Sequence, residues 1–166
     1  MKGLIWLALV AIALRVSGLI PFSSTEIADL LPVQTLTVDV AEGQVKLDAG
    51  ECTGQGDSWQ TALEDLRQGA EGIVFLGTAE QVVLTQEATE LLPEVVESGI
   101  LRPGAVVCAC PGELPAPKEI TEYLSAHDGG VTLRQVQSAL LEGVAIKLPV
   151  LVETEGGLRL YGQDHG

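Results

Sequence analysis

Two cysteines, Cys108 and Cys110, stand two residues apart, and thiols at this spacing can hold a soft metal or form a redox pair. They end an apolar run that begins at Ala105 and is typical of a fully buried strand, in which residues i and i+2 share a face. No further Cys-x-x-Cys and no nearby His completes a metal-ligand set. Because free cysteine is among the most buried residue types, we expect core packing without metal or cofactor. Cys52 is a possible disulfide partner for either thiol in an oxidising compartment, and the sequence leaves this pairing open.

A second pattern, Gly56-Asp57-Ser58, superficially resembles the nucleophile block of Gly-Asp-Ser hydrolases. Such enzymes also need a base, usually from an Asp-x-x-His pair, whereas Asp164 and His165 are adjacent here. A helix cap at Asp57 or Ser58 explains the same residues, with Gly54 and Gly56 as turn formers. Gly54-x-Gly56 lacks the remaining residues of a dinucleotide fingerprint or a P-loop, so a phosphate site is not expected. We therefore expect no catalytic residues and a protein that is not an enzyme.

Composition narrows the class of protein further. The chain has 166 residues, 46% of them hydrophobic, which is enough for the core of one domain. It carries 23 acidic and 9 basic residues, a net charge of -14, and therefore has no electrostatic footprint for nucleic acid. With aromatic residues at 4%, it also has no stacking platform for bases.

The N-terminus indicates the compartment. Lys2 precedes an unbroken apolar run from Leu4 to Leu14, the order of a secretory signal, and Arg15 separates it from the mostly apolar 16–22. Val16 and Gly18 suit the -3 and -1 positions of a cleavage site, with Leu19 then the first mature residue. The alternative is an uncleaved membrane anchor over residues 3–22. We expect residues 1–22 to be a signal peptide or membrane anchor, and residues 23–166 to form one domain on the extracytoplasmic face of the cell membrane.

The rest of the chain interleaves strands and helices. Alternation predicts a hairpin from 35–40 and 45–47, and further strands are expected at 73–76, 81–84, 105–110, 146–152 and 158–161. Helices are expected after Ser58, after Thr85 with a break at Pro93, over 119–126, and after Thr132. The fold class predicted is α+β, a single mixed β-sheet with helices packed against it, in addition to the N-terminal hydrophobic helix.

Several side chains are assigned to positions within these elements. His127 lies just past a helix end, where a partly cationic ring favours the helix dipole and suits a structural role. Pro149 favours an edge position for its strand, since proline cannot donate to a ladder. Helical spacing or strand position predicts burial of the following side chains: Trp59, Ala62, Leu63, Leu66, Phe75, Leu133, Val136, Leu140 and Leu141.

Several blocks together resemble one known family. In chain order they are Glu26–Leu31, Val38-Asp39, Gly54-x-Gly56-x-Ser58-Trp59-x-x-Ala62-Leu63-x-x-Leu66, Val74–Gly77, Val82–Leu84, Thr132-Leu133-x-x-Val136-x-x-Ala139-Leu140, Leu148–Leu151 and Gly157-Leu158-Arg159-Leu160-x-Gly162. This order, over residues 26 to 162, resembles the N-terminal domain of the C-subunit of bacterial spore nutrient-germinant receptors. Family members usually carry a lipobox cysteine, and residues 14–22 contain none, which favours the uncleaved anchor. The family also has further domains downstream.

The resemblance implies a non-enzymatic, membrane-associated protein related to spore germination or sporulation. It would bind membrane-protein partners in a receptor-type complex, with membrane attachment through residues 3–22. Two alternatives from other classes remain: an exported small-molecule or metal-binding protein that uses Cys108 and Cys110, and a structural envelope protein.

Overall fold

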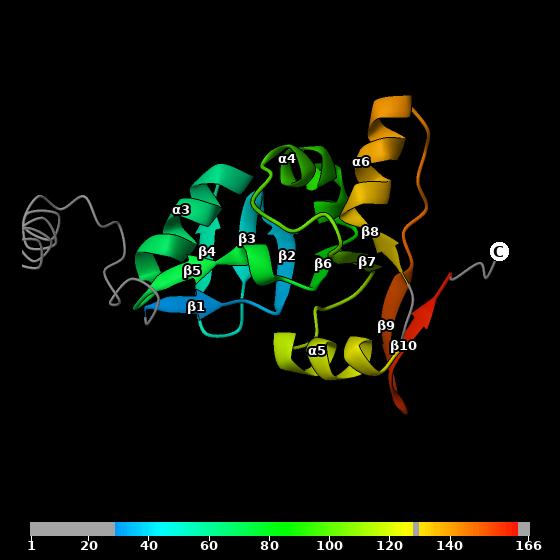
Figure 1. The fold of residues 1–166 in the computed structure, drawn as a ribbon. Helices are drawn as coiled ribbons and strands as arrows, with labels where there is room; N and C mark the ends of the chain where they lie inside the picture. The colour runs from blue at the N-terminus through cyan, green and yellow to red at the C-terminus, as the bar shows by residue number, and fades with distance from the viewer. Residues whose placement is uncertain (1–28, 128–129, 163–166) are drawn as a thin grey trace, which may run out of the picture. The chain divides into compact units, whose positions relative to one another are not determined.

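Helices and strands alternate along a chain that forms an α+β protein (Figure 1). The computed structural model describes residues 29–127 and 130–162, so the expected signal peptide or anchor at 1–22 lies outside the described residues. The chain divides into Met1–Leu30 and Leu31–Gly166, and the description below concerns the second unit. Of the helices within the described ranges, none has the length and apolar character needed to cross a membrane.

The main sheet is mixed, as predicted. Its strand order is β10-β9-β7-β6-β2-β3-β4, and β8 pairs with β7. The four inner strands β9, β7, β6 and β2 are parallel, while antiparallel hairpins form both edges. The strands are β2 (Thr35–Ala41), β3 (Gln44–Asp48), β4 (Thr53–Gly56), β6 (Gln81–Thr85), β7 (Val106–Cys110), β8 (Val131–Thr132), β9 (Val150–Thr154) and β10 (Gly157–Tyr161).

The first hairpin follows from local sequence. Leu36, Val38 and Val40 alternate with polar residues on β2, so one face of the strand is apolar. Glu42 and Gly43 connect β2 to β3, and both have positive φ, 55° and 79°. A two-residue turn with positive φ at both positions matches the twist of the flanking strands. The predicted hairpin is confirmed, with Val40 opposite Val45.

One face of the sheet, the front face, carries α3 (Trp59–Gly69), the 3-10 helix η2 (Glu87–Leu91), α4 (Leu92–Glu97) and α6 (Leu133–Glu142). Ser58 begins α3 and Thr132 begins α6, each in a capping box, so both predicted caps are confirmed. Helix α6 ends at Gly143, whose left-handed φ of 66° is the conformation that glycine commonly adopts at the end of a helix. The break predicted at Pro93 also appears, since Pro93 lies in the first turn of α4, directly after η2.

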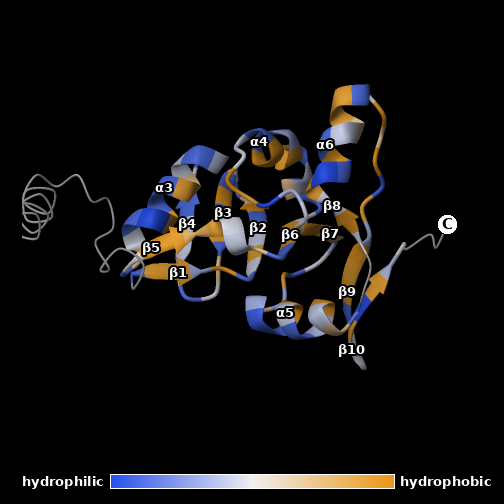
Figure 2. Cartoon of the chain, viewed as in Figure 1, coloured by the Kyte–Doolittle hydropathy of each residue, from blue (hydrophilic) through white to orange (hydrophobic). Residues whose placement is uncertain are grey.

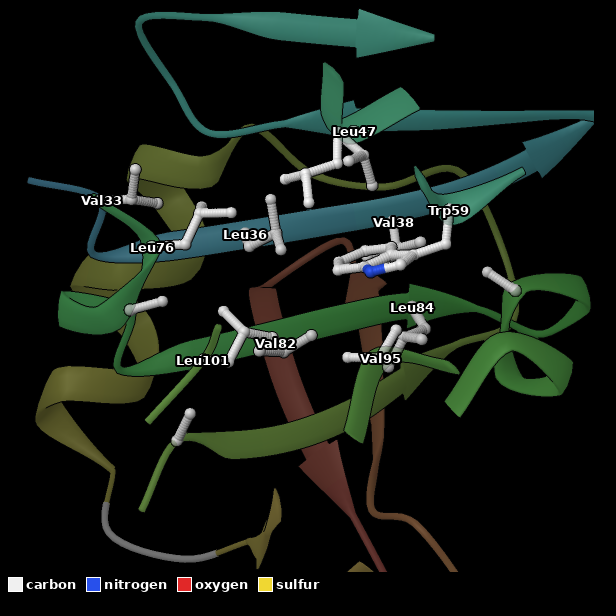
Figure 3. Packing of buried hydrophobic residues seen from close by; sticks show 14 of the residues in the cluster. Val33, Leu36, Val38, Leu47, Trp59, Leu76, Val82, Leu84, Val95 and Leu101 are labelled. Atoms are coloured by element: carbon white, nitrogen blue, oxygen red, sulfur yellow. The ribbon is translucent and has the colours of Figure 1, made fainter. Parts of the chain in front are cut away.

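The main core lies between these helices and the sheet. Trp59 is 1% exposed, and Figure 3 shows its indole reaching over β2 toward Val38 and Leu84. Ala62, Leu63 and Leu66 continue the buried stripe of α3, as the helical spacing predicts. The Trp59 indole nitrogen is buried and has no hydrogen-bond partner among the described residues.

Strand β4 was not predicted, because Gly54 and Gly56 favour a turn over a strand. A Cβ at Gly54 would lie 2.3 Å from the Ala62 carbonyl oxygen, and one at Gly56 would lie 2.6 Å from the Ala62 nitrogen. The glycines therefore let the backbone of α3 pack directly on the edge of the sheet. The interpretation of these glycines as turn formers is therefore wrong, since both residues lie within β4.

On the opposite, rear face, α5 (Pro117–Ala126) is the one helix found among the residues that the structure describes. In Figure 1, α5 lies below the sheet, while α3, α4 and α6 lie above it. Ile120 and Leu124 pack on Val83 and Leu151, forming a second and smaller core. Tyr123 on α5 accepts a hydrogen bond at its hydroxyl from the Leu160 N–H, 2.9 Å away, which fixes β10 to the helix.

Four predictions are wrong: the burial of three side chains and the edge position of one strand. Phe75 is 47% exposed, and Leu140 and Leu141 are 44% and 83% exposed, so these three are not core residues. Phe75 lies on the outer face of the short strand Ile73–Phe75, and Leu140 and Leu141 lie in the last turn of α6. Neither position faces a sheet that it could cover. Pro149 does not mark an edge: it precedes β9, which lies between β7 and β10, so its missing N–H falls outside the ladder.

A two-stranded sheet of β1 (Leu30–Pro32) and β5 (Ile73–Phe75) stands apart from the main sheet. Its strand β5 contacts α3 and continues into the 3-10 turn η1 (Leu76–Thr78). Thr78 ties this turn to the start of the main sheet, since its hydroxyl lies 3.0 Å from both the N–H and the carbonyl oxygen of Val33. The strand predicted at 73–76 is therefore confirmed, but it does not join the main sheet.

Candidate functional site

The rear face of the sheet is covered on one half and open on the other. The open half consists of the outward positions of β2, β3 and β4, and strand register sets them in rows. Asp39 lies opposite Lys46, which lies opposite Gln55. Thr37, Asp48 and Thr53 form the neighbouring row. Every side chain in these two rows is polar.

A groove of about 580 Å³ runs over this open half. The two polar rows form its floor, and one wall is the segment between β7 and α5, at Leu114, Pro115 and Ala116. The groove is open to solvent along the β3 and β4 side, where Lys46, Thr53 and Gln55 are exposed, whereas Thr37 beside the wall is buried. We call this feature the hairpin groove.

Charge in the hairpin groove is mainly negative. Three carboxylates line it, Asp39, Asp48 and Asp65, against the single cation Lys46. Asp48 accepts a hydrogen bond from the Gly50 N–H at 2.7 Å, which orders the turn after β3. Asp65, from α3, accepts the Gln55 N–H at 2.9 Å. That bond uses the Gln55 N–H, a donor on the edge strand β4. Without the bond, this N–H would be free to pair with another chain.

Buried polar contacts hold the wall of the groove in place. Thr35 is 2% exposed and donates its hydroxyl to the Gln81 side-chain oxygen at 2.9 Å. The same hydroxyl lies 2.6 Å from that of Thr121 on α5, which also contacts the Pro117 carbonyl at 2.8 Å. Each such bond stabilises the fold by about 0.5–1.5 kcal/mol. The start of α5, and so the segment leading into it, is therefore fixed to β2 and β6.

The cysteines lie away from the groove and inside the protein. Cys108 and Cys110 are 0% and 2% exposed and share the rear face of β7, where they pack under α5. The core-packing prediction for them is confirmed. Burial raises the pKa of Cys108 from the ordinary 9.0 to about 12, so the thiol stays protonated and unreactive at neutral pH. This burial disfavours the metal or redox use of the pair.

The third cysteine does not complete a disulfide. Cys52 belongs to the front-face core, on the opposite side of the sheet from Cys108 and Cys110, and all three thiols are free. Burial raises the pKa of Cys52, and the nearby carboxylates of Asp48 and Glu51 raise it further. The pairing left open by the sequence is therefore not formed.

The hydrolase-like pattern has a structural role at the residues that the structure describes. The Ser58 hydroxyl oxygen accepts the Thr61 N–H at 3.3 Å as the cap of α3, whereas Asp57 is exposed. Asp164 and His165, the pair considered as its base, lie outside the described residues. His127 ends α5 as predicted, stacked on Tyr123 with ring centroids 4.1 Å apart. Across the described ranges, no three His, Cys, Asp or Glu side chains gather as a metal site.

Sequence reasoning did not identify the groove, although it predicted the hairpin that forms part of its floor. Alternation on β2 and β3 places Thr37, Asp39 and Lys46 on a polar outer face. Thr53 and Gln55 were missed with β4, although they alternate with Gly54 and Gly56 as strand residues do. The wall at 114–116 lies in a segment with prolines at positions 111, 115 and 117, and nothing local in its sequence indicates that it borders a groove.

Comparison with known proteins gives no match: no family model, no curated protein and no solved structure is similar to this chain. The groove itself offers carboxylates, an ammonium group, hydroxyls and amides on an open sheet. Such a surface can recognise a polar partner through hydrogen bonds and charge.

Proposed function

We propose that the chain is a non-enzymatic, membrane-associated domain on the extracytoplasmic face, related to spore germination, which binds a membrane-protein partner through the hairpin groove. Residues 3–22 attach it to the membrane as an uncleaved anchor, and the partner belongs to a receptor-type complex. The order of sequence blocks shared with germinant-receptor C-subunits supports the germination context. A structural envelope protein is the alternative.

One observation carries the binding role: within residues 29–127 and 130–162, half of the rear face has no covering element and is polar, whereas the other half lies under α5. Where α5 crosses the sheet, Val83, Cys108 and Cys110 form an apolar core on β6 and β7, and the polar Gln81 beside them is buried and bonded to Thr35. Where no helix crosses, the floor of the groove bears hydroxyls, amides and charges on a rigid three-stranded scaffold. A flat polar face on rigid strands supports recognition of a folded partner.

Site-specific photo-crosslinking tests this proposal. A photoreactive residue at Lys46 or at Gln55 reports on the groove, and one at Gln137 on α6 is the matched control on the front face, because all three positions are exposed. The full chain is expressed in sporulating cells, and crosslinks are analysed in the membrane fraction. We expect a defined adduct with a germinant-receptor membrane protein from the groove positions and none from Gln137.

Two results contradict the proposal in different ways. Equal crosslinking from Gln55 and Gln137 means that the groove is not the binding face. Recovery of the full chain in the cytoplasmic fraction contradicts the extracytoplasmic location and, with it, the receptor context.

A further inference from the structure

The small sheet carries apolar side chains on both faces. On β5, Val74 is buried at 8% exposure, while its neighbours Ile73 and Phe75 are 54% and 47% exposed. A strand with one face in solvent normally places polar residues outward. The partner strand β1, Leu30–Pro32, is also entirely apolar, and Figure 2 shows both strands in the hydrophobic colour.

The exposed side chains are held in a fixed arrangement. The Phe75 ring lies against the turn that follows it, so that a Cβ at Gly77 would be 3.1 Å from Cζ of the ring. Thr78 closes this turn with a 2.8 Å bond to the Phe75 carbonyl and ties it to Val33. Ile73 and Phe75 therefore form a braced apolar surface, which we call the β5 patch.

Chain connectivity limits how far the β5 patch is from a membrane anchor. Only residues 23–29 separate Phe22, the end of the apolar N-terminal segment, from β1. Eight extended steps from Phe22 to Leu30 span at most about 29 Å. Because β1 pairs directly with β5, an anchor at 3–22 keeps the patch within that reach of the bilayer plus one interstrand spacing of about 5 Å.

We propose that Ile73 and Phe75 lie in the headgroup layer of the bilayer that holds residues 3–22, an inference that rests on the membrane attachment in the proposed function. Apolar and aromatic side chains enter this layer to a depth of about 5–10 Å. Electrostatic attraction does not contribute, because the chain has 23 acidic and 9 basic residues. The contact is therefore hydrophobic and needs no anionic headgroup.

Tryptophan fluorescence in vesicles tests this contact. The full chain carrying Trp6→Phe retains Trp59, which is 1% exposed and shielded from lipid. Phe75→Trp or Ile73→Trp then reports on the patch. Tyr161→Trp is the control, since Tyr161 is 51% exposed on β10, the edge strand at the far end of the sheet order from β4. Each variant is reconstituted in phosphatidylcholine vesicles with or without brominated acyl chains.

We expect brominated lipid to quench Phe75→Trp and Ile73→Trp several times more strongly than Tyr161→Trp. Equal, weak quenching in vesicle-bound protein overturns the lipid contact and leaves membrane attachment intact. A blue-shifted Phe75→Trp emission without quenching also overturns it, because a protein surface then covers the patch. Failure of the chain to float with vesicles overturns both this inference and the membrane attachment.

Discussion

The two halves of the rear face are built from neighbouring strands of one sheet, yet they have opposite chemistry. Under α5, β6 and β7 present Val83, Cys108 and Cys110. Beyond α5, β3 and β4 present Lys46, Asp48 and Gln55 to the hairpin groove. Apolar residues occupy outward positions only where a helix crosses them. Stability is therefore concentrated in the covered half, and the open half is free to change its surface chemistry at little cost to the fold.

The largest loss of stability is expected from truncating a side chain buried under α5. Ile120 is fully buried between α5 and the sheet, so Ile120→Ala should lower the free energy of unfolding by about 2–5 kcal/mol. Urea unfolding measures this, with Glu122→Ala on the exposed side of α5 as the control. A loss no larger than that of the control would mean that α5 contributes little to the covered half.

The second prediction concerns the close packing of α3 on the edge strand β4. Gly54→Ala should cost about 1–3 kcal/mol or more, because its Cβ would lie within 2.6 Å of α3 backbone and side-chain atoms. Gly69→Ala is the control, since its Cβ would meet only the Thr53 carbonyl oxygen, at 3.8 Å. Thermal unfolding of both variants checks this, and equal stability would show that α3 can move away from β4.

The third prediction concerns pH and the buried thiol. The pKa of Cys108 rises from 9.0 in an ordinary thiol to about 12 in the folded protein. The protonated thiol stabilises the fold fully below pH 9.0, and this contribution is lost as pH rises toward about 12. Over that range, Cys108 should lower the free energy of unfolding by up to about 1.4 kcal/mol per pH unit.

Cys108→Ala provides the comparison for this slope. Its unfolding free energy should fall less steeply with pH than that of the parent chain, as measured by urea unfolding across the same alkaline range. Thiol labelling gives a second measurement, since folded protein should react slowly at Cys108 and unfolded protein rapidly. Identical slopes together with rapid labelling would show that this half is open to solvent.

The smallest change in the free energy of unfolding is expected from a substitution in the hairpin groove. Lys46→Gln changes an exposed side chain opposite Asp39, so the free energy of unfolding should change by no more than about 0.5 kcal/mol. Denaturant unfolding checks this, and the same variant should weaken crosslinking from Gln55. A stability loss as large as that for Ile120→Ala would contradict the contrast between the two halves.

Much of the fold follows from local sequence, because hairpins, caps and helix stripes depend on neighbours in the chain. The alternation of Leu36 with Thr37, the Ser58 cap and the break at Pro93 are examples. What local sequence does not contain is which element covers which face. Phe75 and Leu141 have the apolar character of core residues, and only the arrangement of helices leaves them exposed. From local sequence, Gly54 favours a turn, and only the close approach of α3 explains why glycine occupies this strand position.

The groove was only partly predictable for the same reason. Its floor follows from alternation on β2 and β3, whereas its existence depends on α5 packing toward β2, β6, β7 and β9 rather than over β3 and β4. The crossing is fixed by long-range contacts such as that of Thr35 with Thr121, 86 residues apart. No local pattern encodes such a contact.

The position of β2 inside the sheet, between β6 and β3, also implies an order of folding. Strands β2 and β3 and helix α3 involve near neighbours in sequence, so this part can form early. The parallel partner of β2 is β6, and Thr35 meets Gln81 only 46 residues later in the chain. Pairings of long sequence separation are slow to form. A chain that emerges N-terminus first thus presents the β6 side of β2 unpaired until β6 follows, and during that interval a chaperone could bind the edge that later becomes the middle of the sheet.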